Sequence, residues 1–470
     1  MLRASIERVL EVTGGALVAG DASAMTNGLA LDSRKVEPGN VFIALAGEHA
    51  DGHDFVRAAI DAGARAVIVT RAEESVLQQI ADSRDPDAAV VLVDDAVKAV
   101  QALAAYHRSR LICPVIGVTG STGKTTTKDF LRAALQARFK VVASEGNRNN
   151  ELGVPLTIFE AGADTGVLVV EMAMRGSGQI AELAAIARPT HGLVTNVGLS
   201  HVGVLGSQEA IADAKGELVE AIPETGAVFL NGDDAWTERL AAKSRARVVR
   251  YGLSESCDVR AEDISTAEGG FPVFTLVTGE ERAAVTLPVL GKHNVYNALA
   301  AAAVALDLGV EAERIVDGLA GANMSGMRMD VFESASGVTV INDAYNANPV
   351  SMRAAIAALT DVRAPGRRVA VLGDMAELGS LAELAHFQLG EEVARSRIDV
   401  LVTVGSLARR IAEGARAEGM DPDSIRPCAT PEEASEVLDD LLEPGDAVLV
   451  KASRVMGLER VVEGITEPHV

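Results

Sequence analysis

An apolar strand pattern, PVIGV, runs directly into the glycine-rich segment TGSTGKTTTKD between residues 114 and 129. Glycines let backbone N–H groups close around a phosphate, and the positive N-terminus of a following helix also attracts anions. A strand, a glycine-rich loop and a helix in this order are typical of phosphate loops that bind nucleotides. The segment therefore predicts an α/β sheet that presents a nucleotide site at the end of this strand.

Within this loop, Lys124 is placed to reach the outer phosphates and Thr125 to hold a magnesium ion. The glycines stand at 117, 120 and 123, and Val118 occupies the position where the strict phosphate-loop pattern has glycine. A glycine-rich turn with an incidental lysine is the alternative interpretation. The loop indicates ATP but not a reaction. The predicted nucleotide contacts are Gly120, Ser121, Thr122, Gly123, Lys124, Thr125 and Thr126.

The chain has 470 residues, more than one hydrophobic core usually holds. Short β-branched runs alternate with Ala-rich helical patterns throughout, which favours parallel sheets covered by helices. We therefore predict an α/β protein of three domains. These are a small α/β domain over residues 1–92, a central phosphate-loop domain with a mostly parallel sheet over 93–322, and a Rossmann-like domain over 323–470.

Composition excludes several classes of function. The net charge of −23 disfavours sequence-independent binding to nucleic acid or anionic lipid, and aromatic residues make up only 3% of the chain. Cys113, Cys257 and Cys428 lie far apart, which argues against disulfides or structural zinc. No apolar run approaches the roughly 20 residues that span a bilayer. We expect a cytoplasmic protein without membrane insertion.

Three polar residues beyond the loop are candidates for chemistry. Glu171 ends the apolar strand VLVVEM, where α/β sheets present site residues, and its carboxylate is a suitable magnesium ligand. His201 lies in the loop GLSHVGVLGS, and Lys215 lies in the helix pattern QEAIADAKGELVEAI. Taken alone, these could equally be a structural acid, a surface histidine and a solvated lysine.

A second group of candidates follows later in the chain. Asn294, at the start of the helix pattern HNVYNALAA, is suited either to capping the helix or to contacting adenine. Arg328 can make bidentate phosphate contacts, and Asp343 follows an apolar strand and can hold ribose hydroxyls. Asn346 lies in the segment NANP, which is equally consistent with a simple turn.

Together these segments resemble the Mur ligases, cytoplasmic enzymes that add amino acids to the UDP-linked peptidoglycan precursor. The resemblance covers nearly the whole chain, with the segments in the family's order. They are GVTGSTGKTTT, EMAM, TNVGLSH, AKGE, GKHNVYNALAA and NDAYNANP. Four more segments favour the family branch that joins D-alanyl-D-alanine to a UDP-N-acetylmuramoyl-tripeptide. They are EGNRNNELGVPLT, EMAMRGSGQI, VLGDMAELG and KASRVMGLERVV.

The resemblance implies a role for each matching residue. Lys124 and Thr125 would bind phosphates and magnesium, and Glu171 and His201 would bind magnesium. Lys215 would carry a carbamate and so act as an anionic metal ligand. The nucleotide contacts would continue at Asn294, Arg328, Asp343 and Asn346, and the substrate contacts would be Ser33, Arg34, Asn149 and Asn150.

The implied reaction is ATP-dependent amide ligation through an acyl phosphate, in a monomer. The first domain would hold the UDP end of the substrate, and the last would contact ATP and the incoming dipeptide. Ala173, Gln179 and Arg148 depart from the family's usual glycine, acidic and aromatic residues, which leaves the shape of the substrate loop open. A folylpolyglutamate synthase-like enzyme, another Mur ligase and a nucleotide-dependent switch remain alternatives.

Overall fold

The computed structural model describes residues 2–47, 50–85, 87–267 and 269–466. Its packing divides the chain into two compact units. One unit contains residues 1–117, 139–173 and 181–190, and the other contains residues 118–138, 174–180 and 191–470. The chain is a mixed α/β protein, as the strand-helix alternation predicts.

The N-terminal part of the first unit, up to α4, contains a five-stranded sheet in the order β2-β7-β6-β5-β4 and a separate antiparallel pair, β1 and β3. Strands β4 to β7 are parallel, and β2 joins antiparallel to β7. The strands are β1 (Arg3–Ser5), β2 (Ala16–Ala19), β3 (Met25–Asn27), β4 (Leu29–Ala30), β5 (Val41–Ile43), β6 (Ala66–Val69) and β7 (Ala89–Leu92). The helices are α1 (Ile6–Thr13), α2 (Val56–Asp61), α3 (Glu74–Ala81) and α4 (Ala96–Arg108).

A nine-stranded sheet follows, in the order β16-β15-β14-β13-β12-β11-β8-β10-β9. Its strands are β8 (Val115–Thr119), β9 (Val141–Ala143), β10 (Val167–Glu171), β11 (His191–Val194), β12 (Ala227–Asn231), β13 (Arg247–Gly252), β14 (Val259–Thr266), β15 (Pro272–Thr278) and β16 (Glu281–Thr286). The associated helices are α5 (Lys124–Gln136), α6 (Gly153–Glu160), α7 (Gln179–Ala187), α8 (Val202–Leu205), α9 (Gln208–Ala221), α10 (Thr237–Ala241), α11 (His293–Asp307) and α12 (Ala312–Ala320).

The antiparallel edge of this sheet was not predicted from the sequence. β14, β15 and β16 pair antiparallel, whereas β11 to β14 are parallel. The first half of β14 alternates buried and partly exposed residues, the pattern of a strand with one covered face. The sheet is therefore mostly parallel, with a meander added at one side.

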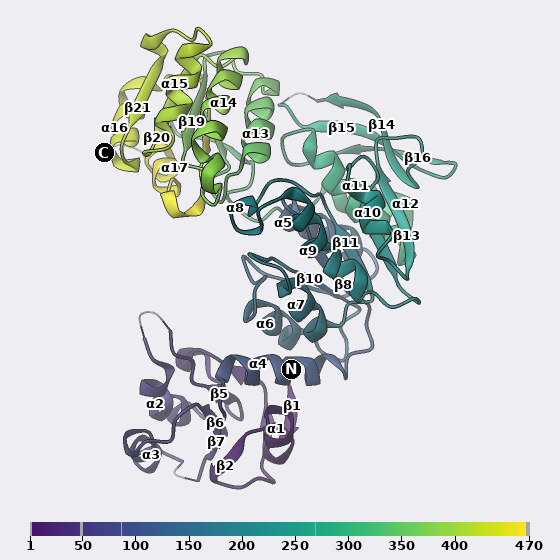
Figure 1. The fold of residues 1–470 in the computed structure, drawn as a ribbon, viewed down its shortest axis with the longest axis vertical. Helices are drawn as coiled ribbons and strands as arrows, with labels where there is room; N and C mark the ends of the chain where they lie inside the picture. The colour runs from purple at the N-terminus through teal and green to yellow at the C-terminus, as the bar shows by residue number, and fades with distance from the viewer. Residues whose placement is uncertain (1, 48–49, 86, 268, 467–470) are drawn as a thin grey trace. The chain divides into compact units, whose positions relative to one another are not determined.

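The C-terminal part of the chain forms a six-stranded sheet in the order β17-β18-β22-β19-β20-β21, parallel except for β17. One face packs against α16 and α17, and α13, α14 and α15 pack beside one another (Figure 1). The strands are β17 (Asp330–Glu333), β18 (Thr339–Asn342), β19 (Arg368–Gly373), β20 (Val400–Val404), β21 (Ile425–Cys428) and β22 (Ala447–Lys451). The helices are α13 (Pro349–Asp361), α14 (Ala382–Arg395), α15 (Arg409–Ala417), α16 (Pro431–Leu441) and α17 (Glu459–Thr466).

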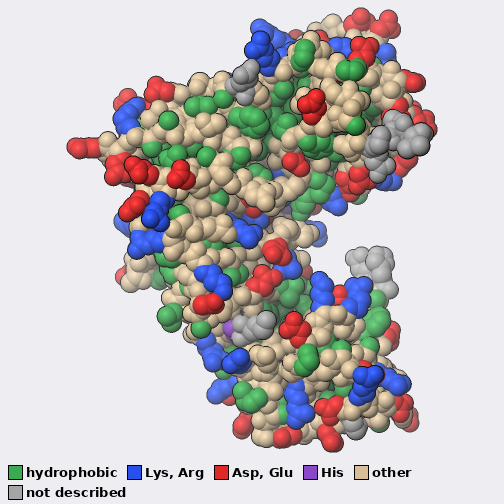
Figure 2. All heavy atoms as spheres, turned by 180° about the vertical axis from the view of Figure 1, so that it is seen from behind, with side chains coloured by type: hydrophobic (Ala, Val, Ile, Leu, Met, Phe, Trp, Pro, Cys, Tyr) green, Lys and Arg blue, Asp and Glu red, His purple; other side chains and the backbone are tan. Residues whose placement is uncertain are grey.

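The surface mixes charges of both signs. Figure 2 shows acidic and basic side chains interspersed over the face in view. Within the described part of the chain, no helix is both long and apolar enough to cross a bilayer. On this face the acidic side chains lie among basic ones and do not gather in a single patch.

Candidate active site

The glycine-rich loop follows β8 and leads into α5, as the sequence predicts. Gly120 passes so close to Thr195 that a Cβ atom would lie 1.8 Å from the Thr195 Oγ1. Gly123 has a φ of +78°, and a Cβ there would lie 2.3 Å from the Asn297 Oδ1. Both positions therefore need glycine, which explains the spacing of this loop physically.

Residues that follow β11 hold the loop from one side. The Thr195 hydroxyl donates to the Thr122 carbonyl oxygen at 2.6 Å. The Asn196 amide closes a second contact, because its Oδ1 accepts from the Thr122 N–H at 3.1 Å and its Nδ2 donates back to the Thr122 carbonyl at 3.1 Å. The Ser121 N–H donates to the Asn196 carbonyl at 3.0 Å. Contact of Ser121 and Thr122 with a nucleotide stays a prediction, since these N–H groups bond within the protein.

Three features of the loop fit a bound polyphosphate. Helix α5 begins after Gly123 with no side-chain capping hydrogen bond among the described residues, so its positive end has no side-chain acceptor at that position. The Lys124 Nζ bends back over the loop and donates to the Gly120 carbonyl oxygen at 2.8 Å. Thr125, in the first turn of α5, is buried. The loop thus combines a helix end, an ammonium group and a hydroxyl, as phosphate binding requires.

Lys215 lies on α9 in the same unit and is 1% exposed. Burial, and then the nearby Lys124 cation, bring the pKa of its amine well below the usual value. No hydrogen bond or ion pair of the Lys215 side chain occurs within the described residues. The buried side chain therefore favours the neutral form of its amine. It is not the solvated lysine that would be expected on the surface of a helix.

His201 precedes α8 with a φ of +65°. Its Nδ1 lies 2.8 Å from a Glu377 carboxylate oxygen, although the two groups are not aligned as a regular hydrogen bond. Burial lowers the pKa of the imidazole, Glu377 opposes that change, and the neighbouring Lys124 and Lys215 side chains add to it. A neutral imidazole can offer a nitrogen lone pair to a metal ion.

Glu171 ends β10 in the other compact unit and is 2% exposed. The Asn149 side-chain amide donates to its Oε1 at 2.8 Å, and the Asn149 carbonyl accepts from the Ala173 N–H at 2.9 Å. The Asn150 Oδ1 accepts from the Gly153 N–H at the start of α6. Both asparagines therefore have structural partners, and their predicted contact with a substrate stays a prediction.

The described residues contain no group of three His, Cys, Asp or Glu side chains arranged to hold a metal ion. Magnesium prefers oxygen ligands, keeps several waters and commonly shares phosphate oxygens with one or two protein groups. Taken each within its own unit, the Thr125 hydroxyl and the buried Glu171 carboxylate are both ligands of this kind. The residues present thus fit magnesium that arrives with a nucleotide better than a permanently bound ion.

Family models match three successive stretches of the chain: the Mur ligase family catalytic domain over residues 26–108, the Mur ligase middle domain over 118–305, and the Mur ligase glutamate ligase domain over 327–454. The UDP-N-acetylmuramoyl-tripeptide–D-alanyl-D-alanine ligase of Bacillus subtilis (strain 168) is 37% identical over 468 residues, 99% of each chain. The chain belongs to the Mur ligase family.

Solved structures of Mur ligases share the fold. A crystal structure of MurF from Acinetobacter baumannii matches with a TM-score of 0.87 and 31% identity, covering 99% of each chain. MurF from Thermotoga maritima in complex with ADP matches with a TM-score of 0.78 and 29% identity, covering 94% of this chain and 97% of that one. The predicted resemblance and three-domain α/β architecture are confirmed.

In this Mur ligase, Asn294 connects α11 to the phosphate-loop helix. Its Nδ2 donates to the Leu290 carbonyl oxygen at 2.7 Å, and its Oδ1 accepts from the Asn297 Nδ2 at 2.7 Å. The Asn297 Oδ1 in turn accepts from the Thr127 hydroxyl on α5 at 3.2 Å. Asn294 thus has internal partners at both ends of its amide, and its contact with adenine stays a prediction.

Asp343 follows β18, as predicted, but pairs with Lys451, the first residue of the segment KASRVMGLERVV, for which the sequence indicated no role in the site. The Lys451 Nζ at the end of β22 lies 2.5 Å from the Asp343 Oδ2 and donates to the Asn346 carbonyl at 2.9 Å. The Arg328 guanidinium lies over the Tyr345 ring, 4.1 Å from its centroid. The sequence signals for Lys451 are a charged residue that closes the apolar strand AVLVK and its place at the start of KASRVMGLERVV.

Ser33 and Arg34 lie in a single 3₁₀ turn, Ser33–Lys35, in the first unit. The Arg34 guanidinium makes two contacts with the Asp32 carboxylate, at 2.9 and 2.8 Å, and its side chain is 86% exposed. Hydrogen bonds from Arg34 lower the pKa of the Asp32 carboxyl to about 2. Arg34, which the sequence predicts to bind an anionic substrate, is therefore accessible to solvent, but it is already paired with the neighbouring Asp32 carboxylate.

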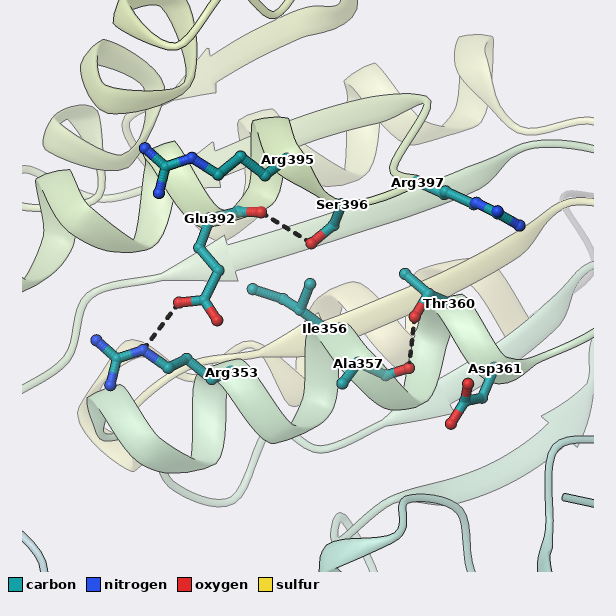
Figure 3. Close-up of a pocket in the computed structure, with 9 residues that line it drawn as sticks. All are labelled: Arg353, Ile356, Ala357, Thr360, Asp361, Glu392, Arg395, Ser396 and Arg397. Carbon is teal, nitrogen blue, oxygen red and sulfur yellow. Dashed lines mark hydrogen bonds and ion pairs between the residues drawn. The ribbon is translucent and has the colours of Figure 1, made fainter. Parts of the chain in front are cut away.

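A shallow cavity of about 360 Å³ lies between α13 and α14. Figure 3 shows its wall, where Arg353 pairs with Glu392 and the Ser396 and Thr360 hydroxyls bond to backbone carbonyls. None of the predicted site residues lines it. The candidate active site therefore depends on the phosphate loop and its neighbours rather than on this cavity.

Proposed function

We propose that this Mur ligase uses ATP to join D-alanyl-D-alanine to a UDP-N-acetylmuramoyl-tripeptide, which gives the pentapeptide precursor of peptidoglycan, ADP and phosphate. The observation that carries the proposal is the phosphate loop at 120–125, with buried Lys215 in the same unit, in a chain that aligns end to end with a relative named for this reaction. The ADP complex of Thermotoga maritima MurF supports nucleotide binding.

The chemistry follows from the difficulty of the reaction. A carboxylate resists attack by an amine because its oxygen is a poor leaving group. Transfer of the γ-phosphoryl group of ATP to the tripeptide carboxylate would form an acyl phosphate, and attack by the dipeptide amine would release phosphate and form the amide. Lys124 and the N-terminus of α5 would stabilise the negative charge on the transferring group.

Magnesium would neutralise charge on the phosphates and orient them. Thr125, Glu171 and His201 would contribute ligands, and Lys215 would contribute as a carbamate. A carbamate forms when a neutral amine adds to carbon dioxide, and burial lowers the pKa of the Lys215 amine, which favours its neutral form. The modification would turn a buried amine without a partner among the described residues into an anionic oxygen ligand.

The other candidate residues would bind the two ends of the substrates. Ser33 and Arg34, in the domain predicted over residues 1–92, would hold the uridine diphosphate end, with Asn149 and Asn150 nearer the peptide. Asn294, Arg328, Asp343 and Asn346 would hold the nucleoside and phosphates of ATP. The central and last domains, predicted over 93–322 and 323–470, would then share the nucleotide. We further propose a cytoplasmic monomer, which light scattering after size exclusion would test.

The test is phosphate release from ATP by the full chain. Release should depend on both the UDP-tripeptide and D-Ala-D-Ala, and should fall to background when either is left out. Equal ATP turnover without the two substrates would instead favour a nucleotide-dependent switch. Release with glutamate and a folate in their place would favour a folylpolyglutamate synthase-like enzyme.

A further inference from the structure

Lys451 is a buried cation with a specific pair of partners. It ends β22, and its side chain is 2% exposed. Its Nζ donates to the Asp343 Oδ2 at 2.5 Å and to the Asn346 carbonyl oxygen at 2.9 Å. A buried ammonium group is stable only when such partners compensate for its lost hydration. Lys451 is therefore tied to both the first residue and the middle of the loop at 343–348.

Ser453, two residues further along, reinforces the same connection. Its buried hydroxyl accepts from the Ala376 N–H at 2.8 Å and lies 3.4 Å from the Ala347 carbonyl oxygen, to which it donates. The far end of the loop is fixed by Asn348, whose side chain accepts from the Ser351 N–H and caps α13. The segment 451–453 thus holds the 343–348 loop from within the sheet.

Asp343 depends on this lysine electrostatically. Burial raises the pKa of the Asp343 carboxyl, and the Lys451 ammonium is the strongest of the groups that oppose the rise. The Asp343 Oδ1 also accepts from the Met329 N–H at 3.2 Å. Without Lys451, the carboxylate would be left buried with its main counterion removed, and it would protonate or move.

We propose that Lys451 is a positioning residue for the nucleotide, which fixes the Asp343 carboxylate and the 343–348 loop so that Asp343 can accept hydrogen bonds from the ribose hydroxyls. The proposal rests on the nucleotide role proposed for Asp343. Lys451 itself makes no contact with the nucleotide in this scheme. Its effect reaches the ribose through Asp343.

The experiment is calorimetric binding of Mg-ADP to the full chain and to three variants: Lys451→Met, Asp343→Asn and the double variant. Loss of a hydrogen bond to a charged group predicts about tenfold weaker binding for Lys451→Met. Because both residues act through one contact, the double variant should bind ADP as Asp343→Asn does. In turnover, the KM for ATP should rise while the KM for D-Ala-D-Ala stays unchanged. Lys98→Met, at an exposed position on α4, is the matched control and should bind normally.

Wild-type ADP affinity in a folded Lys451→Met variant would overturn the proposal, and so would fully additive losses in the double variant. If circular dichroism shows that Lys451→Met does not fold, Asp343→Asn is compared with the double variant, in which no unpaired carboxylate remains. Equal ADP affinity in those two supports the proposal, and unequal affinity overturns it. ADP binding needs no acyl substrate, so a failure of the ligation assay would leave this result intact.

Discussion

The phosphate loop and the 32–34 turn are both expected to bind phosphate groups, yet they are built in opposite ways. The loop is held by Thr195 and Asn196, which are distant in sequence, and its glycines leave no room for a side chain. The turn is held by its own residues, with exposed Arg34 folded onto Asp32. At the loop a ligand would meet a backbone that is already held in place, but at the turn it would have to replace Asp32 as the partner of Arg34.

The largest expected effect lies at the loop. We expect Lys124→Ala to lower phosphate release by at least about a thousandfold, because it removes a cation from the transferring phosphoryl group. Circular dichroism should show an intact fold, since Lys124 is only partly buried. Lys140→Ala removes an exposed lysine and should leave turnover unchanged. Normal turnover in Lys124→Ala would remove the loop from the mechanism.

Lys215→Ala should lower phosphate release by about a hundredfold, the scale of losing a residue that supports a metal site. A short carboxylic acid such as acetate should restore part of the activity by occupying the position of the carbamate. The same acid should not rescue Lys124→Ala, which serves as the control. Activity near the wild-type level without acid would show that Lys215 has no role in the reaction.

Gly123→Ala tests whether the loop is as constrained as its contacts indicate. The new Cβ would meet the Asn297 Oδ1 at 2.3 Å, in addition to adopting a left-handed backbone. We expect the free energy of unfolding to fall by about 2 kcal/mol or more, and phosphate release to fall by about tenfold. Gly14→Ala has a similar φ of +68° with no atom within 4 Å, so chemical denaturation should show a smaller loss there. Equal losses in the two variants would mean that backbone strain alone accounts for the effect.

The smallest effect is expected at the turn. Arg34→Ala should raise the KM for the UDP-tripeptide by about tenfold, through loss of charged hydrogen bonds, without changing the thermal midpoint. A raised KM for ATP instead would place Arg34 at the other substrate.

The same variant has a spectroscopic readout. The Asp32 carboxyl should titrate with a pKa of about 2 in the wild type and closer to its ordinary value in Arg34→Ala, as followed by carboxyl NMR. Because the folded-state pKa is depressed, any stability from the pair is present above the ordinary pKa and is lost as pH falls through about 2. An unchanged titration would show that Arg34 does not hold Asp32 in solution.

The sequence allowed the strand-loop-helix of residues 115–136 to be predicted because its glycines, lysine and threonine are consecutive. It did not reveal why Gly120 and Gly123 are needed, since Thr195 and Asn297 approach them only in the folded chain. The pairing of Lys451 with Asp343 was missed for the same reason, because it depends on β18 and β22 being neighbours. Local chemistry was predictable, but partners that the sheet order brings together were not.

The bonds from Thr195 and Asn196 to the phosphate loop also bear on communication within the enzyme. Because these bonds order the phosphate loop when the chain folds, binding of a nucleotide needs little further loss of conformational entropy. The loop therefore binds nucleotide more tightly than a flexible loop with the same contacts would. It also cannot signal that nucleotide has arrived by changing from disorder to order. Any coupling between ATP and the other substrates would therefore have to pass through groups that change partners on binding, of which Lys124 on the Gly120 carbonyl is the nearest example.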